Sequence, residues 1–262
     1  MTNDNDMVVG VNEVERFGAL MAFSLRQGGK SPAPFDTLNF SEEQGDSAEN
    51  VRHNFELLGK RLGLEPRQIA TCTQVHRDRV IILDSVPDSP PEADAIVTSV
   101  GAIYPAVKVA DCLPILLVDP VRHVAAAIHA GWRGSVMRIT SKVIQTMRGR
   151  YGCRPSDLVA ALGPAIGKCC YAVDDTVLTP FREGFPEAER FISTQRLNRT
   201  QPEQSYLDLR SANRFELTLE GVSEEKIHSI DLCTSCRPDL LFSHRRDGAA
   251  SGRHIALAGF RP

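Results

Sequence analysis

Three side chains of types that bind transition metals lie in separate segments of this chain. They are His76 in TCTQVHRDRV, Cys112 in VKVADCLPILLVDP and His129 in VAAAIHAGWRGS. Neutral imidazole and thiolate are ligands that suit zinc and also copper. A structural zinc site normally has four protein ligands, whereas three protein ligands and one open position are typical of a catalytic site. These residues therefore predict a metal-dependent enzyme.

Spacing alone does not establish this metal site. The intervals between the three residues match no compact zinc motif, and a chain with seven histidines and seven cysteines contains many such triples. The setting favours the site, because each candidate adjoins an apolar run and is surrounded by Asp, Arg, Trp and Gly. Zinc with an open position lowers the pKa of bound water to about 7, which makes hydroxide available for attack at a purine carbon. Alternatively, the metal holds or polarises a substrate.

Asp111, adjacent to Cys112, is a candidate for proton transfer or for orienting a ligand. Successive side chains of a strand point to opposite faces, so both residues reach one site only if the strand predicted at 104–110 ends before them. Pro114 favours such an irregularity. In the alternative interpretation, Asp111 only forms hydrogen bonds within a turn.

Two arginines are candidates for binding an anionic co-substrate through a bidentate guanidinium group: Arg26 in FSLRQGG and Arg133 in GWRG. The alternative for each is an ion pair with a carboxylate. Trp132, the only tryptophan, lies close to His129 and beside two glycines. Its ring is expected either to stack on a base or to brace a loop, and bracing is the commoner role.

The other cysteines suggest structural thiols. Cys233 and Cys236 form a CxxC motif, but no second pair at the spacing of a zinc ribbon accompanies it. Cys169 and Cys170 are adjacent and cannot form a disulfide with each other without strain.

Hydrophobic periodicity predicts helices and strands that alternate along the chain. The segment 48–62 is typical of an amphipathic helix, with Ser47 as its N-cap and Gly63 as its stop. The segment 184–205 is polar and is expected to be irregular. Further helices are expected at 136–147, 174–183 and 208–220, and strands at 80–83, 95–100, 104–110, 114–119, 123–129, 157–163 and 226–232.

Composition indicates an ordinary globular protein. Its 262 residues are 42% hydrophobic, which suits one compact domain spanning 1–262. The net charge of -3 gives no electrostatic footprint for nucleic acid or for an anionic membrane. The polar, acidic beginning of the chain lacks a secretory signal, and no apolar run is long enough for a membrane span. We expect a cytoplasmic protein with reduced thiols.

Several segments together resemble one known family, the polyphenol oxidase family that is also called the purine nucleoside phosphorylase family of bacterial YfiH-like proteins. The resemblance spans nearly the whole chain. The matching segments are FSLRQGG at 23–29, PFDTLNF at 34–40, QVH at 74–76, VADCLPILLVDP at 109–120, HAGWRGS at 129–135, LGPAIGKCCYAV at 162–173 and FSHRRDG at 242–248.

The resemblance implies that His76, Cys112 and His129 are zinc ligands and that purine nucleosides bind nearby, with phosphate as co-substrate. It implies phosphorolysis of adenosine, inosine and 5'-methylthioadenosine, with adenosine deamination as a further activity. Arg26 would then help to hold phosphate and Asp111 would assist proton transfer. The implied fold is α+β, with mixed β-sheets packed between flanking helices in four layers, α/β/β/α.

Two departures from the family pattern are expected to change substrate preference or pH optimum. His244 stands where the family commonly has Tyr before paired arginines, and LNFS, ending at Ser41, stands where LNLG is frequent. Three other functions stay open: a cysteine hydrolase with Cys112 as nucleophile, a copper-dependent, laccase-like polyphenol oxidase, and a non-enzymatic binding protein. A multi-copper cluster usually needs HxH pairs, which this chain lacks.

Overall fold

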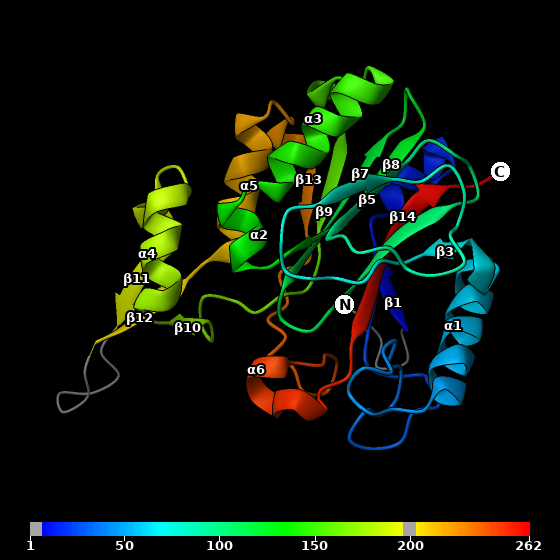
Figure 1. Ribbon diagram of the computed structural model, residues 1–262, viewed down its shortest axis with the longest axis horizontal. Coiled ribbons are helices and arrows are strands. Elements are labelled where there is room, and N and C mark those ends of the chain that lie inside the picture. Colours follow the sequence, from blue (N-terminus) through cyan, green and yellow to red (C-terminus); the bar gives the residue numbers. More distant parts are fainter. Residues whose placement is uncertain (1–6, 196–202) are drawn as a thin grey trace.

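The computed structural model describes residues 7–195 and 203–262 and contains three β-sheets (Figure 1). The six-stranded sheet has the order β13-β9-β7-β8-β5-β4, the five-stranded sheet β1-β2-β14-β6-β3, and the three-stranded sheet β10-β12-β11. The strands are β1 (Val8–Gly10), β2 (Ala19–Ser24), β3 (Ile69–Ala70), β4 (Val80–Ile82), β5 (Ala95–Thr98), β6 (Tyr104–Val109), β7 (Leu113–Asp119), β8 (Val124–Ala130), β9 (Val159–Leu162), β10 (Ala172–Val173), β11 (Ile192–Gln195), β12 (Gln204–Leu207), β13 (Ile227–Ser229) and β14 (His254–Phe260).

Helices cover the outer faces of the two larger sheets. The α-helices are α1 (Ala48–Leu62), α2 (Trp132–Val136), α3 (Ile139–Tyr151), α4 (Asp175–Gly184), α5 (Leu209–Leu219) and α6 (His244–Asp247). Helix α1 packs on the five-stranded sheet, while α3 and α5 pack on the six-stranded sheet. A further apolar cluster joins the two sheets to each other. The layers therefore run α/β/β/α, which confirms the predicted α+β architecture.

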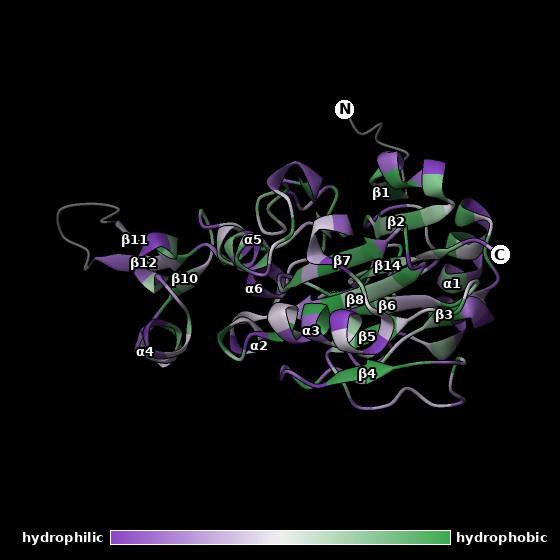
Figure 2. Cartoon of the chain, turned by 90° about the horizontal axis from the view of Figure 1, so that it is seen from above, coloured by the Kyte–Doolittle hydropathy of each residue, from purple (hydrophilic) through white to green (hydrophobic). Residues whose placement is uncertain are grey.

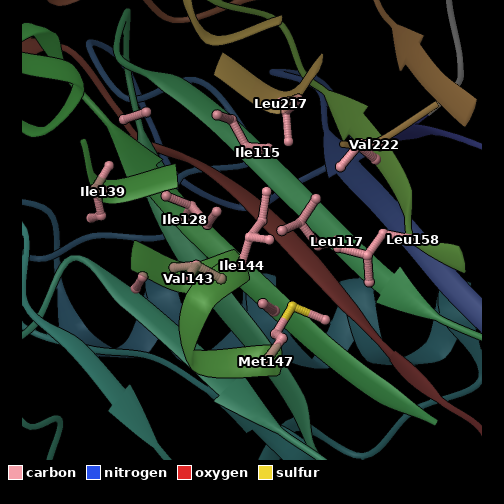
Figure 3. Close-up of a cluster of buried hydrophobic side chains, with 14 of the residues drawn as sticks. Ile115, Leu117, Ile128, Ile139, Val143, Ile144, Met147, Leu158, Leu217 and Val222 are labelled. Carbon is pink, nitrogen blue, oxygen red and sulfur yellow. The ribbon is translucent and has the colours of Figure 1, made fainter. Parts of the chain in front are cut away.

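The largely apolar sequences of β7 and β8, interrupted by Asp119 and His129, follow from their position between two layers. In β7, Ile115 and Leu117 face α3, while Leu116 faces the five-stranded sheet. Because successive side chains of a strand point to opposite faces, a strand covered on both sides is largely apolar on both faces. Figure 3 shows the α3 side of this core, where Val143 and Met147 meet the strands.

Helix α1 has the bounds predicted from the sequence. The Ser47 hydroxyl accepts a hydrogen bond from the Asn50 backbone N–H at 3.1 Å, and Gly63 has φ 70°, as expected of a glycine that ends a helix. Figure 2 shows hydrophobic residues gathered on the central strands, such as β7 and β8. Within the described part of the chain, no helix combines the length and the apolar character needed to cross a bilayer.

The sequence prediction omits the short elements β1, β3, β10 and α6, and it differs from the structure in three larger respects. The segment 184–205 is not irregular throughout, since it includes β11 and part of β12, which pair antiparallel; its residues 196–202 lie outside the described part of the chain. The helix predicted at 136–147 starts later than predicted: Val136 ends the separate short helix α2, and α3 begins at Ile139, after Arg138 with φ 62°.

The third difference concerns β2 and β14, which the sequence prediction omits although they are central in their sheet. Both strands are buried along their whole length. Their residues are largely apolar on both faces, but β2 has no β-branched residue and β14 has only Ile255, so neither has the composition by which an apolar run is recognised as a strand.

Candidate metal centre and its pocket

The structure brings the three predicted metal ligands together. One ligand atom from each of His76, Cys112 and His129 lies within 4.8 Å of the others. His76 belongs to the loop after β3, Cys112 to the turn between β6 and β7, and His129 to the end of β8. We call these residues the three-ligand site.

Strand register explains why two of the ligands meet. In the β7–β8 pair, Leu113 is opposite Ala130 and Pro114 is opposite His129, so Cys112 and His129 lie at the same end of the hairpin. Alternation along β8 places His129 on the same face as Ala127, which packs toward the five-stranded sheet. The ligands therefore lie where the two sheets meet.

Asp94, which the sequence analysis does not identify, orients the three-ligand site. Its Oδ1 atom lies 2.8 Å from His129 Nδ1 and accepts a hydrogen bond from the His76 backbone N–H at 2.9 Å, while Oδ2 accepts from the Arg77 N–H at 2.8 Å. Because Nδ1 of His129 is engaged, Nε2 is the nitrogen that remains for a ligand. In the sequence, the hint of this role is an aspartate immediately before the apolar strand β5. In the folded protein this carboxylate is fully buried.

The site favours a thiolate at Cys112. Burial acts to raise the pKa of this thiol, but the charges and hydrogen bonds of His129 and His76 outweigh burial and lower the pKa to about 6. Burial acts to lower the pKa of His129, but the neighbouring Cys112 and Asp94 outweigh burial and raise the pKa to about 9. Thiolate is the form of cysteine that binds metal. One thiolate and two imidazoles within reach of a single ion therefore suit zinc or copper.

Asp111 is held in a left-handed backbone conformation beside the three-ligand site. Strand β6 ends at Val109, as the sequence argument required, and Asp111 has φ 89°. Its Oδ1 accepts a hydrogen bond from the Thr234 hydroxyl at 2.5 Å and its Oδ2 from the Arg245 backbone N–H at 2.6 Å. A non-glycine residue in such a conformation costs about 1–3 kcal/mol, and such residues concentrate at functional sites. His76 also has a positive φ, of 57°.

A pocket of about 450 Å³ opens at the three-ligand site and has a volume suited to a small organic ligand. Its wall includes Asp111 and the aromatic side chains of Trp132 and Tyr171. Four basic side chains also line it: Lys108, Arg133, Arg245 and Arg253. Among the described residues, none of the three arginines lies within ion-pair distance of a carboxylate.

Trp132 and Arg133, the predicted substrate contacts, both line the pocket. The Arg133 guanidinium lies 4.4 Å from the centre of the Trp132 ring. Trp132 also packs against the apolar cluster around α4, so the ring braces the structure while it borders the pocket.

The structure does not bring Arg26 into this pocket. Its guanidinium pairs with the Asp36 carboxylate at 3.1 Å and donates to the carbonyl oxygens of Asp36 and Pro238. It also lies 4.9 Å from the centre of the Phe242 ring. These contacts satisfy the guanidinium group within the loops that surround it, which is the carboxylate pairing weighed as the alternative for this residue.

Comparison with known proteins gives a family for this arrangement. The model of the family described as "Multi-copper polyphenol oxidoreductase laccase" matches residues 20–261. The chain belongs to this family. The family's description refers to copper, and the three-ligand site lies within the matched region.

Proteins with other names are also similar to this chain. A protein of Geobacillus stearothermophilus named purine nucleoside phosphorylase YlmD is 35% identical over 253 residues, covering 93% of this chain and 91% of that protein. A protein of an unknown prokaryotic organism named adenosine deaminase RL5 is 33% identical, covering 84% and 85%. The crystal structure of Bacillus licheniformis YfiH matches with a TM-score of 0.91 at 29% identity, covering 99% of this chain and 98% of that one.

The two positions at which this chain departs from the family pattern, Ser41 and His244, both line the pocket. Ser41 is buried, whereas His244 is exposed at the start of α6. An imidazole ring therefore lies at the rim of the pocket where the resemblance gives a phenol.

Proposed function

We propose that this protein is a zinc-dependent purine nucleoside phosphorylase that acts on adenosine, inosine and 5'-methylthioadenosine with phosphate, and that it also deaminates adenosine. The observation that carries the proposal is the convergence of His76, Cys112 and His129 at a pocket lined by arginines that have no carboxylate partner among the described residues. The names of similar proteins support nucleosides as the substrate class.

The arginines supply the argument for phosphate. Guanidinium groups without carboxylate partners favour an anionic ligand, because they bind its oxygens through two parallel hydrogen bonds. Arg253 suits this role best. Its Nη1 atom already donates to the carbonyls of Ser251 and Gly252, which fixes the side chain. In this proposal Arg253, Arg245 and Arg133 take the part that the resemblance suggested for Arg26.

Phosphorolysis breaks the bond between the sugar and the purine nitrogen and forms a bond from the same carbon to a phosphate oxygen. The leaving purine must gain a proton. Asp111 lines the pocket and is held by Thr234 and Arg245, so its carboxylate is positioned to assist that proton transfer. Trp132 and Tyr171 provide apolar ring surface against which a base can stack.

The ligand set fits zinc, with His76, Cys112 and His129 as the three protein ligands and Asp94 holding the His129 ring. When bound, zinc supplies Lewis acidity to a substrate oxygen or nitrogen. The chain contributes the remaining functions: it fixes the ligands, places the carboxylate of Asp111 and gathers positive charge for phosphate.

The test is chromatography of products after the purified protein is incubated with adenosine, with and without phosphate. Adenine that forms only with phosphate supports phosphorolysis, and inosine that forms in either condition supports deamination. The Cys112→Ala variant should form neither product. Absence of both products from wild-type protein that contains bound metal would overturn the proposal.

A cysteine hydrolase is a second candidate function, favoured by one observation. Cys112, His129 and Asp94 form a chain of hydrogen-bonded groups in the order nucleophile, base and orienting carboxylate. Such an enzyme would retain activity after chelation of metal and lose it after thiol alkylation. The zinc enzyme should lose activity in both treatments.

Copper-dependent oxidation of polyphenols would be a secondary activity. The described residues contain two groups of at least three potential metal ligands, of which only the three-ligand site includes histidine. A multi-copper centre draws on several imidazole-rich groups, so this site would hold at most a single copper ion.

A further inference from the structure

Four cysteines from two distant parts of the chain form a second cluster. Cys169 and Cys170 lie in the loop between β9 and β10, and Cys233 and Cys236 lie in the loop between β13 and α6. All four sulfur atoms lie within 4.8 Å of one another. We call these residues the four-cysteine cluster. In the sequence, the CxxC motif lacks a second pair at ribbon spacing, but the fold supplies that pair as two adjacent cysteines.

The sulfur positions suit a shared metal ion. The Sγ atom of Cys236 lies 3.6 Å from that of Cys169 and 3.4 Å from that of Cys170. Four thiolates at about 2.3 Å from a tetrahedral zinc ion have their sulfurs about 3.8 Å apart. A disulfide needs a sulfur separation of about 2.05 Å, which is far shorter. The cluster therefore has the dimensions of a tetrahedral four-thiolate set.

Backbone groups hold the sulfur atoms in place. Cys233 Sγ accepts a hydrogen bond from the Gly167 N–H at 3.2 Å and another from the backbone N–H of Cys236. Such bonds suit a sulfur that carries negative charge. Gly167 favours this close approach, because a Cβ at that position would lie 3.2 Å from Cys169 Sγ and 3.3 Å from Cys233 Cβ.

The two loops are joined beside the cluster. Ala165 pairs with Cys233 in a parallel β-bridge, and the Thr234 N–H donates to the Ala165 carbonyl at 3.1 Å. Cys169 and Cys236 are exposed, whereas the other two cysteines are half-buried, so an ion can enter from solvent. The sulfurs are thus preorganised and also accessible.

We propose that the four-cysteine cluster binds one zinc ion as a closed structural site, separate from the three-ligand site. Tetrahedral sites of four thiolates are typical of zinc, and four protein ligands leave no position for substrate. The proposed ion cross-links residues 169–170 to residues 233–236 and so fixes two loops in addition to the hydrogen bonds that join them.

The four-cysteine cluster would stabilise residues that form or hold the wall of the pocket of the proposed enzyme. Thr234, next to Cys233, donates its hydroxyl to Asp111, and Tyr171, next to Cys170, lines the pocket. The four cysteines themselves do not line the pocket. They are therefore positioning residues, and loss of the ion should change substrate affinity more than it changes the metal at the three-ligand site.

The experiment is elemental analysis of zinc per chain in protein purified under reducing conditions. A Cys169→Ser/Cys236→Ser double variant should bind one zinc fewer than wild type, whereas Cys153→Ser, which removes a buried thiol elsewhere, should bind the same number. The Cys112→Ala variant should retain one zinc. This variant distinguishes the two proposals, because the zinc that it retains belongs to the four-cysteine cluster and does not depend on the three-ligand site.

If the double variant does not fold, a second measurement, made on Cys112→Ala, tests the proposal. In the Cys112→Ala variant loaded with cobalt(II), four thiolates should give strong sulfur-to-cobalt charge-transfer absorption, since the thiolate of the three-ligand site is absent. Unchanged zinc content in a folded double variant, or no such absorption in cobalt-loaded Cys112→Ala, would overturn the proposal. So would a count of five free thiols in unreduced, unfolded wild type, because wild type without a disulfide has seven.

Discussion

The three-ligand site and the four-cysteine cluster present similar atoms to a metal in two different settings. The first combines one sulfur with two imidazoles beside a pocket of about 450 Å³, and the second gathers four sulfurs outside that pocket. Three ligands leave a coordination position for substrate, whereas four close the ion off. Ligand number thus separates a site proposed for catalysis from a site proposed for architecture.

The two regions also differ in how their ligands are oriented. At the three-ligand site, the carboxylate of Asp94 holds the His129 ring and three backbone N–H groups of one loop. At the four-cysteine cluster, the backbone amides of Gly167 and Cys236 point at the Cys233 sulfur. A buried charge can fix an imidazole and a loop together, whereas a sulfur needs only local N–H donors.

The strongest effect is expected in Cys112→Ala. Removing the sulfur of the three-ligand site should abolish phosphorolysis and deamination, while circular dichroism and one bound zinc stay unchanged. Cys236→Ser should have the opposite profile: lower thermal stability and higher KM, with kcat retained. Product assays and melting curves on both variants check the comparison. Equal loss of kcat in the two variants would remove the proposed division between catalysis and architecture.

A chelator should remove zinc from the three-ligand site before it removes zinc from the four-cysteine cluster. The three-ligand site opens into the pocket and keeps a free coordination position, so a chelator can form a bond to the ion before the protein ligands leave. The four-cysteine cluster offers no free position. Activity is therefore expected to disappear with the first zinc released, before the melting temperature falls. Simultaneous release of all zinc would contradict this order.

A smaller effect is expected from Asp94→Asn. The amide cannot reproduce a carboxylate that accepts from the His129 ring and from the backbone N–H of His76 and Arg77, so metal affinity should fall about 10–100-fold. Competition with a chromophoric chelator measures the affinity. Asp78→Asn is the matched control, since Asp78 pairs with Lys142 outside the three-ligand site. Equal affinity in Asp94→Asn and wild type would show that Asp94 does not tune the site.

A further effect is an acid sensitivity that belongs to neither site. Burial, together with the nearby charge of Arg26, lowers the pKa of His254 to about 3 from its ordinary 6.5. The ring stays neutral in the folded protein while the unfolded chain binds a proton below about pH 6.5. Stability should therefore fall by up to about 1.4 kcal/mol for each pH unit as the pH drops from about 6.5 to about 3.

Denaturant unfolding of metal-free wild type and His254→Gln at pH 6 and pH 4 measures this contribution. Glutamine keeps an acceptor for the Phe242 N–H, which donates to His254 Nε2 at 2.8 Å, but it has no titrating ring. The variant should lose less stability between the two pH values. Identical losses would mean that acid acts on this protein through other groups, the metal ligands included.

Much of the secondary structure is predictable because local patterns decide it. The cap at Ser47 and the stop at Gly63 define α1, and the apolar runs of β5 to β8 appear at the predicted places. Two central strands, β2 and β14, escape prediction because they have few β-branched residues: β2 has none and β14 has only Ile255. The pairing of β11 with β12 escapes it because the segment is polar and a strand there depends on its partner.

The candidate site is visible in the sequence where residue chemistry is distinctive, and hidden where a role depends on neighbours. Residue type and setting single out His76, Cys112 and His129, and the structure brings them together. Arg26 has the same chemistry as Arg253, but only the first has a carboxylate within ion-pair distance among the described residues. Asp94 resembles any aspartate that precedes a strand.

Residues close together in the chain were enough to define the types of ligand, the bounds of α1 and the apolar runs that place β7 and β8 in the core. The folded arrangement alone selects which groups share a site: Asp94 with His129, Asp111 with Thr234, and Cys170 with Cys236, 66 residues further along the chain. Strand register and loop pairing fix those distances, and both depend on contacts between segments that are remote in sequence.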